Sequence, residues 1–327
     1  MPYPDPAVTA NVYCAGFLDD VLVSVVAPAV EAAGGGYGWV MRYGKCGEHL
    51  KVRFHGDEST ADSFRSALET AALELFGRLE GEPAPETSWR NLPAIDREDE
   101  AAEDYPDRTL LWTRYRRSHV SLGSEPFLDD DGYVDRFTRV LGLGLDRALS
   151  TFTEPLPIAH RVRQSGLLKV ALECVGGFGL ELDECVLYLR YHRDWLLRSL
   201  VQRAKDPSER TAAIISRFDA KAESLGKILA SLSALATQQW RGAVQEPEGE
   251  LGMAFARLEE YLADRIDEPS YAVDPFASNP RFPVSFKALH GIANQFGLGP
   301  ADEAFTYHLL LRSVAPAPAQ EVVALTP

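Results

Sequence analysis

The chain has 327 residues, of which 46% are hydrophobic and 25% are charged, a composition typical of a globular protein with a sizeable core. Its formal net charge of −15 at pH 7 argues against a nucleic-acid partner, because affinity for a phosphate backbone depends on Lys and Arg that neutralise phosphates. The sequence has no run of roughly 18 apolar residues, as a membrane-spanning helix needs, and no signal peptide, which predicts a cytoplasmic protein without a membrane partner.

The N-terminal part of the chain predicts alternating strands and helices. A short strand is expected at Asn11–Phe17, and apolar residues at helical spacing predict a helix at Leu18–Ala33. Trp39–Tyr43 and His49–Gly56 have the alternating pattern of two strands, and the glycines between them suit the tight turn of a hairpin. Ser59–Glu80 begins with a Ser/Thr cap candidate and continues as an amphipathic helix.

The middle of the chain begins with an acidic stretch that contains several prolines. Residues 82–108 are most simply a solvated loop between elements. Arg108–Leu122 predicts a strand that ends in a cluster of basic residues, and Phe127–Ser150 predicts a further helix. From Pro157 to Trp240 helix dominates, because apolar side chains recur there at helical spacing.

The C-terminal part of the chain predicts two closing helices. A proline-rich loop at Glu268–Pro283 precedes them, and they are expected at Val284–Leu298 and Ala301–Ser313, separated by glycines and a proline. Residues 316–327 read as a disordered tail. Few strands early and many helices late predict an α+β fold, with a small N-terminal sheet and a predominantly helical C-terminal half, in a single domain over residues 1–315.

Neither a metal site nor a cofactor is predicted. The four cysteines form no CxxC pair, which disfavours both structural zinc and a disulfide framework. No Walker loop, GxGxxG after a strand, GxSxG or HExxH occurs. The expected chemistry is therefore cofactor-independent.

The second strand of the hairpin carries charge on one face. His49, Lys51 and Arg53 alternate with apolar residues, so all three are expected on the face opposite the core. One interpretation is a solvated strand face with ordinary salt bridges. The other is a substrate groove in which these groups act as hydrogen-bond donors to developing negative charge.

Two segments carry a resemblance to a known family. "WVMRYGKCGEHLKVRFHG" (Trp39 to Gly56) resembles the "W-F-x-R-Y … G-x-H-L-R-x-R" segment of the C-terminal elimination domain of class I lantibiotic dehydratases. "SFKALHGIANQFGLGPADEAFTYHLLLR" (Ser285 to Arg312) is similar to that domain's closing "S-x-x-H-x-x-x-N-R-x-x-G … E" helix pair. The order and spacing of the two segments agree with the family over nearly the whole chain.

The sequence departs from the family pattern at several positions. Lys51 stands for the first arginine of "HLRxR", Gln295 follows the asparagine in place of arginine, and the usual "R-Y-G-G" is missing. The segment Thr113–Tyr133 stands in its place and looks most like the standalone pyridine synthases of thiopeptide biosynthesis. The resemblance therefore implies a lyase or cyclase that joins two dehydroalanines of a modified ribosomal peptide by a formal [4+2] cycloaddition. Dehydration and elimination of the leader peptide then complete a pyridine-centred macrocycle.

This resemblance also implies which residues act. His290 is the best general acid/base candidate, since an ordinary imidazole titrates near pH 6.5, and Asn294 lies four residues further on the same helix face, where it could orient the ring. Ser285 lies five residues before His290, about 140° away by helical rotation, so a cooperative pair with His290 is doubtful, but it remains a substrate-binding candidate. Arg53 is expected to act with His290, and the two segments are expected to converge on one cavity.

The strand near residue 114 supplies further candidates. Arg114 and Arg116 alternate onto one face, where they are expected to act on substrate, Arg114 as a catalytic group; ion pairs with the acidic loop are the alternative. Ser121 is a weaker candidate from the same segment. The remaining substrate-binding candidates are His49, Lys51, Tyr43 and Trp112, of which Trp112 could pack in the core or stack on a thiazole ring.

The expected partner is a dehydrated, azole-containing precursor peptide with its leader; homodimerisation is left open. Three rival functions also remain open. The chain could be a detached lyase that eliminates glutamate from glutamylated Ser or Thr, although the missing "RYGG" argues against this. It could be an aminoacyl-tRNA-dependent peptide ligase, which neither length nor charge favours. It could also be a non-catalytic protein that binds a leader peptide by β-addition to a strand edge.

Overall fold

The computed structural model of the protein describes residues 5–44, 47–83, 105–114, 129–152, 158–177, 180, 182–202, 204–226, 230–231, 249–263, 265 and 281–314. Two compact units make up the chain. The first contains Met1–Arg163 and Gly291–Gly297, and the second contains Gln164–His290 and Leu298–Pro327. The expected single domain over 1–315 stays a prediction, and the tail at 316–327 lies outside the described residues. Within the described helices, none is long and apolar enough to cross a bilayer.

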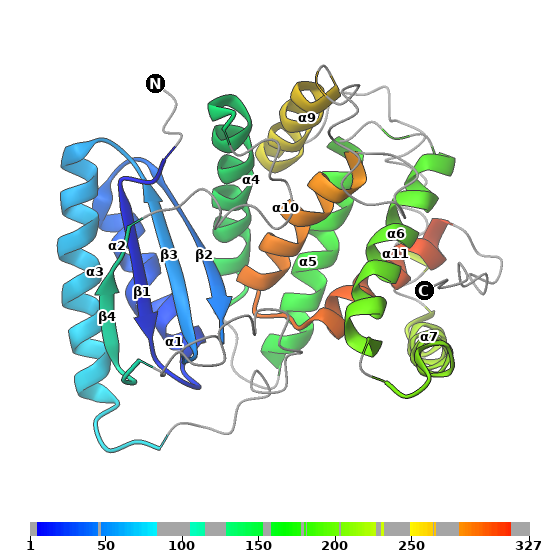
Figure 1. Cartoon of the computed structure of the whole chain (residues 1–327), viewed down its shortest axis with the longest axis horizontal. Coiled ribbons are helices and arrows are strands. Elements are labelled where there is room, and N and C mark those ends of the chain that lie inside the picture. Colours follow the sequence, from blue (N-terminus) through cyan, green and yellow to red (C-terminus); the bar gives the residue numbers. More distant parts are fainter. Residues whose placement is uncertain are drawn as a thin grey trace. The chain divides into compact units, whose positions relative to one another are not determined.

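A four-stranded antiparallel sheet is the centre of the first unit (Figure 1). Its strands, in the spatial order β2-β3-β1-β4, are β1 (Val8–Tyr13), β2 (Tyr37–Tyr43), β3 (His49–His55) and β4 (Thr109–Trp112). Its helices are α1 (Leu18–Val21), α2 (Ala27–Ala33), α3 (Glu58–Arg78) and α4 (Asp131–Leu149), with a π-helical segment, η1 (Leu22–Val26), between α1 and α2. The small N-terminal sheet predicted from the sequence is confirmed.

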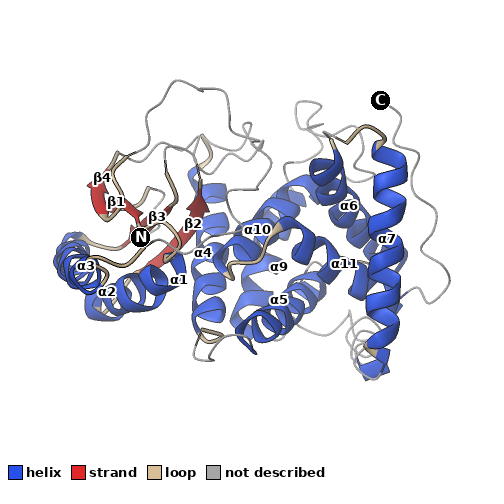
Figure 2. Cartoon of the chain, turned by 90° about the horizontal axis from the view of Figure 1, so that it is seen from below, coloured by secondary structure: helices blue, strands red, loops and turns tan. Residues whose placement is uncertain are grey.

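One face of the sheet forms the main core of the first unit. Val8, Ala10 and Val12 of β1 lie opposite Phe54, Val52 and Leu50 of β3, and all six are buried in one apolar cluster. Helices α2 and α3 lie side by side against this face (Figure 2), which buries their apolar residues with it. The two-residue alternation of the strands thus separates a core face from the face that carries His49, Lys51 and Arg53.

The boundaries of the early elements differ from the predicted ones for local reasons. The first strand lies at Val8–Tyr13, three residues before the expected start, because the chain turns after Cys14, where Gly16 adopts φ 78°. The expected helix at Leu18–Ala33 contains a π-helical turn, and Pro28, which cannot donate a backbone hydrogen bond, follows that turn. Helix α3 is capped by Asp57 rather than Ser59, because the Asp57 carboxylate accepts a 2.9 Å hydrogen bond from the Thr60 N–H.

Helices make up the described part of the second unit. They are α6 (Leu182–Val201), α7 (Pro207–Ser224), α9 (Gly249–Ala263) and α11 (Pro300–Val314), with most of α5 (Ile158–Gly177) and α10 (Arg281–Gln295). Helix α6 packs along α11, and both bury large side chains at this contact. The predominantly helical C-terminal half is confirmed. Helix α9 was not predicted, although Leu251, Phe255, Leu258 and Leu262 recur at helical spacing.

Candidate functional site

The second unit holds an imidazole–carboxylate pair. His290 lies on α10, and Glu303 lies in the first turn of α11, after the glycines that separate the two helices. Nδ1 of His290 is 2.7 Å from Oε2 of Glu303, and Tyr307 Oη donates a 3.4 Å hydrogen bond to the other carboxylate oxygen. The Glu303 side chain is 1% exposed and that of His290 is 25% exposed. The carboxylate is therefore enclosed, whereas part of the imidazole reaches the surface of the unit.

Electrostatics favour the ionised form of this pair. Burial alone would favour neutral imidazole, but the charge of Glu303 and its hydrogen bond outweigh that effect and raise the pKa of His290 above its usual value of 6.5. The partial positive charge of the α11 N-terminus also stabilises a carboxylate in the first helical turn. Because Nδ1 is held by Glu303, Nε2 is the nitrogen that can exchange a proton, and it has no hydrogen-bond partner among the residues described. This is the arrangement of an oriented general acid/base.

Aromatic side chains surround the imidazole. Phe286, one turn earlier on α10, stacks on His290 with ring centroids 5.6 Å apart. Trp195 of α6 lies 4.5 Å from Phe286 and 6.4 Å from His290, again between centroids. The segment "YHRDW" of α6 (Tyr191 to Trp195), which is not among the predicted site residues, therefore contributes to the surroundings of His290. Only the packing of α6 in three dimensions reveals this, because the segment reads as an ordinary stretch of helix.

A second histidine packs against the aromatic neighbours of this pair. His192 is fully buried, and its ring centroid is 4.8 Å from those of both Phe286 and Tyr307. Within the described part of the chain neither of its ring nitrogens has a hydrogen-bond partner. Burial, and to a smaller degree the charge of His290, holds the pKa of His192 well below its usual value. His192 is thus a neutral imidazole at physiological pH.

The other predicted residues of α10 have structural partners. Ser285 is buried, and its hydroxyl donates a 3.1 Å hydrogen bond to the Phe282 carbonyl. Asn294 accepts a 2.6 Å hydrogen bond from the backbone N–H of Arg42, so the imidazole is held by Glu303 rather than by Asn294. Gln295 likewise accepts from the N–H of Val40, so two side-chain amides bind the outer backbone edge of β2. Substrate binding by Ser285 and Asn294 stays a prediction.

In the first unit, the charged face of β3 is not a solvated surface. His49 is 2% exposed and Arg53 is 1% exposed, and Lys51 is half-buried. Lys51 Nζ lies 3.3 Å from the centroid of the Tyr43 ring, which is a cation–π contact. Arg53 donates a 3.0 Å hydrogen bond to the Val52 carbonyl, and its guanidinium lies 5.7 Å from the Trp39 ring centroid. The interpretation as an ordinary solvated face does not fit these burials.

His49 has a defined tautomer. Its Nδ1 lies 2.8 Å from the Gly47 carbonyl, and since a carbonyl can only accept, Nδ1 carries the proton. The ring packs against Tyr13 with centroids 4.4 Å apart. Burial lowers the pKa of His49 to about 4, because the charged form would lose its hydration. At neutral pH His49 is therefore uncharged and has a lone pair at Nε2.

For the remaining candidates within the described residues, the structure shows position and exposure. Arg114 follows β4 and is exposed, and Trp112, at the end of β4, is 43% exposed. Arg116 and Ser121 lie outside the described residues. Arg53 and His290 belong to different compact units, so their convergence on one cavity stays a prediction.

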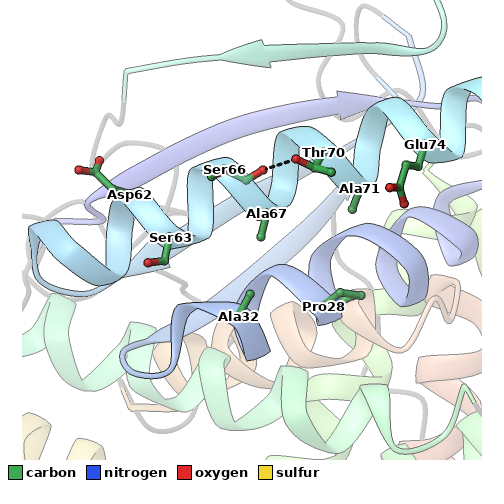
Figure 3. Close-up of a pocket in the computed structure, with 9 residues that line it drawn as sticks. All are labelled: Pro28, Ala32, Asp62, Ser63, Ser66, Ala67, Thr70, Ala71 and Glu74. Carbon is green, nitrogen blue, oxygen red and sulfur yellow. Dashed lines mark hydrogen bonds between the residues drawn. The ribbon is translucent and has the colours of Figure 1, made fainter.

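A surface depression lies elsewhere in the first unit. It has a volume of about 670 Å³ between α2 and α3 (Figure 3) and is lined largely by small and hydroxyl-bearing side chains. Asp62 and Glu74 are its charged lining residues, and none of the predicted site residues that the structure describes lines it. In the part of the chain that is described, no group of three or more His, Cys, Asp or Glu is placed to hold a metal ion. The pair of His290 and Glu303 and the polar face of β3 are therefore the candidate functional groups.

Comparison with known proteins gives the fold. No family model and no curated protein matches the chain. Among solved structures, "Pyridine synthase, TbtD, from thiomuracin biosynthesis" matches with a TM-score of 0.59 and 17% identity, over 95% of this chain and 98% of that chain. The tRNA-dependent lantibiotic dehydratase MibB from Microbispora sp. 107891 matches with a TM-score of 0.45 and 14% identity, over 96% of this chain and 28% of that chain. The chain thus has the fold of the pyridine synthase TbtD, and the resemblance predicted from the sequence is confirmed for the fold.

Proposed function

We propose that the protein is a pyridine synthase of thiopeptide biosynthesis. Its substrate is a dehydrated, azole-containing precursor peptide that still carries its leader. The reaction is a formal [4+2] cycloaddition between two dehydroalanines, followed by loss of water and of the leader peptide as an amide, which leaves an aromatic pyridine. The observation that carries the proposal is the oriented pair of His290 and Glu303 in a chain with the pyridine synthase fold.

The pair suits the proton transfers of the later steps. Loss of water requires a proton on the departing hydroxyl, and expulsion of the leader requires a proton on the departing amide nitrogen. Each step also removes a proton from the new ring. His290, protonated at Nε2 because Glu303 raises its pKa, can donate the first proton and regain one from the ring, so it ends each step as it began. Glu303 holds the ring in place throughout.

In this proposal the other predicted residues bind the peptide substrate and polarise its reacting amide. Arg53, Arg114 and Arg116 supply positive charge, and Arg53 and Arg114 act as donors to oxygen atoms of the reacting amide. The proposed substrate-binding residues are His49, Lys51, Tyr43, Arg116, Ser121, Ser285, Asn294 and Trp112. Positioning two alkenes of one flexible chain within reach can contribute up to about 7–11 kcal/mol in favourable systems, so substrate binding carries much of the expected rate enhancement.

A reconstituted reaction tests the function. Purified protein is mixed with a synthetic azole peptide that carries two dehydroalanines behind its leader, and the products are followed by mass spectrometry and absorbance. Release of a leader-length amide with a new pyridine chromophore supports the proposal. Binding without product would instead indicate a non-catalytic leader-binding protein. Loss of a glutamate mass from a glutamylated peptide would identify the elimination lyase and overturn the proposal.

A further inference from the structure

The polar face of the sheet carries more than the charges of β3. Asn11 lies directly opposite Lys51, Thr9 opposite Arg53, and Tyr13 opposite His49. Residues that pair directly in an antiparallel sheet point to the same face. Asn11 and Thr9 therefore share the face of His49 and Lys51, although neither was singled out in the sequence. Their alternation with Val8, Ala10 and Val12 was the signal that could have placed them there.

Three polar atoms on this face lack partners among the described residues. His49 Nε2, Asn11 Oδ1 and Thr9 Oγ1 are each enclosed, and in the described part of the chain none of the three is hydrogen-bonded. His49 Nε2 can only accept, because Nδ1 carries the single ring proton and donates it to Gly47. A carboxamide oxygen can likewise only accept. Enclosed polar atoms are almost always satisfied in folded proteins, so a group of three on one face indicates a ligand that completes them.

We infer that this face binds an extended peptide segment by accepting hydrogen bonds from its backbone N–H groups, at His49 Nε2 and Asn11 Oδ1. The inference rests on the proposed function in that the substrate is a peptide. It differs from the expectation drawn from the sequence, in which the face supplied donors alone. Thr9 Oγ1 is the third of these atoms, and as a hydroxyl it can either donate or accept a hydrogen bond.

The spacing of the two acceptors suits such a segment. Asn11 and His49 are diagonal neighbours on adjacent strands, since His49 lies two residues from Lys51 along β3. Diagonal neighbours in a sheet have side chains about 7–8 Å apart. The N–H groups along one edge of an extended chain recur every second residue, or about 6.8 Å at a rise of 3.4 Å per residue. Two successive N–H groups of one edge can therefore reach the two acceptors.

Neighbouring groups make the face selective for amides. The lowered pKa of His49 keeps its ring neutral, so the lone pair at Nε2 is available at physiological pH. Lys51 lies between His49 and Arg53 on the same face of β3, and its ammonium lies beside the Tyr43 ring, from where it can approach a peptide carbonyl. An amide that donates its N–H to His49 while a cation faces its oxygen is polarised towards the iminol form that the proposed cycloaddition needs.

The experiment observes the imidazole nitrogens of the full-length protein. Protein labelled with ¹⁵N-histidine is titrated with a leader-bearing azole peptide in which alanines replace the dehydroalanines, so that it binds without reacting. In the free protein, His49 is expected to show a protonated Nδ1 and an unprotonated Nε2. Addition of the peptide is expected to move the Nε2 resonance towards hydrogen-bonded values. His55 is the internal control, because its Nε2 on the same strand face already lies 3.2 Å from the Trp39 Nε1–H, and its resonance should not move.

Variants give the second readout. His49→Phe and Asn11→Ala are each expected to weaken binding of the same peptide about tenfold. The inference would be overturned if the His49 resonance does not move and both variants bind the peptide with unchanged affinity. If the wild-type protein still converts a reactive peptide in that case, the proposed function is left standing. Failure of the wild-type protein to convert the reactive peptide, with the His49 shift present, would overturn the proposed function alone. Absence of both peptide binding and turnover would overturn both.

Discussion

Replacement of Glu303 by glutamine is the sharpest test of the imidazole–carboxylate pair. Nδ1 of His290 and Oε2 of Glu303 are 2.7 Å apart, the carboxylate is enclosed, and the imidazole is three-quarters covered. A hydrogen bond between charged partners contributes about 1.5–3 kcal/mol. A double-mutant cycle of Glu303→Gln and His290→Gln, measured by urea unfolding, should therefore give a coupling energy of about 1.5–3 kcal/mol at pH 6.

The coupling energy should depend on pH in a defined direction. The pKa of His290 is raised in the folded protein, so folding favours the protonated imidazole. The stabilisation is complete below the ordinary pKa of 6.5, which applies to the unfolded chain, and is lost as the pH rises through the folded-state pKa. The coupling energy measured at pH 9 should therefore be clearly smaller than at pH 6.

Asp302→Asn is the matched control. Asp302 shares the first turn of α11 with Glu303, so the substitution removes a carboxylate from the same helix N-terminus. His290 has no hydrogen bond to it, and a cycle of Asp302→Asn with His290→Gln should give a coupling energy near zero. A coupling energy below about 1 kcal/mol for the Glu303 cycle at pH 6 would refute the assignment of an enclosed charged pair, since exposed pairs give about 0.2–1 kcal/mol. A coupling energy that is the same at pH 9 as at pH 6 would refute it as well.

Three further outcomes are expected. His290→Ala should slow turnover of the azole peptide by about 100-fold or more while its dissociation constant stays within twofold, measured by steady-state kinetics and calorimetry; an unchanged rate would assign His290 a structural role. His192→Phe should leave the melting temperature unchanged or raise it, because it removes two enclosed nitrogens that have no partner in the described part of the chain; a clear drop by calorimetry would mean that they are satisfied. Asp19→Asn should lower the free energy of unfolding by about 1–3 kcal/mol, because the Asp19 carboxylate forms salt bridges of 2.7 Å with both Arg42 and Arg163. The pKa of Asp19 is lowered in the folded protein, so the difference in unfolding free energy between wild type and variant should shrink as the pH falls below 4, measured by urea unfolding.

Local patterns sufficed to predict the elements that carry the candidate residues. The hairpin of β2 and β3 followed from alternation and glycines, and α10 and α11 followed from helical spacing broken by Gly297, Gly299 and Pro300. Boundaries were less predictable where a side chain outside the pattern decided them. Asp57 caps α3 through a single oxygen, and periodicity alone does not distinguish it from Ser59 two residues later.

The partners of the candidate residues were not predictable in the same way. Alternation placed His49, Lys51 and Arg53 on one face, but it carries no information on how far that face is buried. Glu303 reads in the sequence as an ordinary first-turn acid of a helix, and its contact with His290 depends on the turn between α10 and α11. Trp195 lies beside the same imidazole, and His192 lies beside its neighbour Phe286; both come from more than 90 residues away in the sequence, which no local pattern reports.

His49 and His290 have opposite environments, and in the proposed function this difference divides their roles. His49 is enclosed beside cations and has no carboxylate partner among the described residues, so its pKa falls to about 4 and it stays neutral. His290 is held by a carboxylate at a helix N-terminus, so its pKa rises and it keeps a proton to higher pH. Where environments push the pKa values of two like groups apart, one serves as an acceptor and the other as a proton donor under the same conditions. A neutral ring on a sheet face is therefore suited to bind amide N–H groups, and a charged ring beside Glu303 is suited to protonate a leaving group.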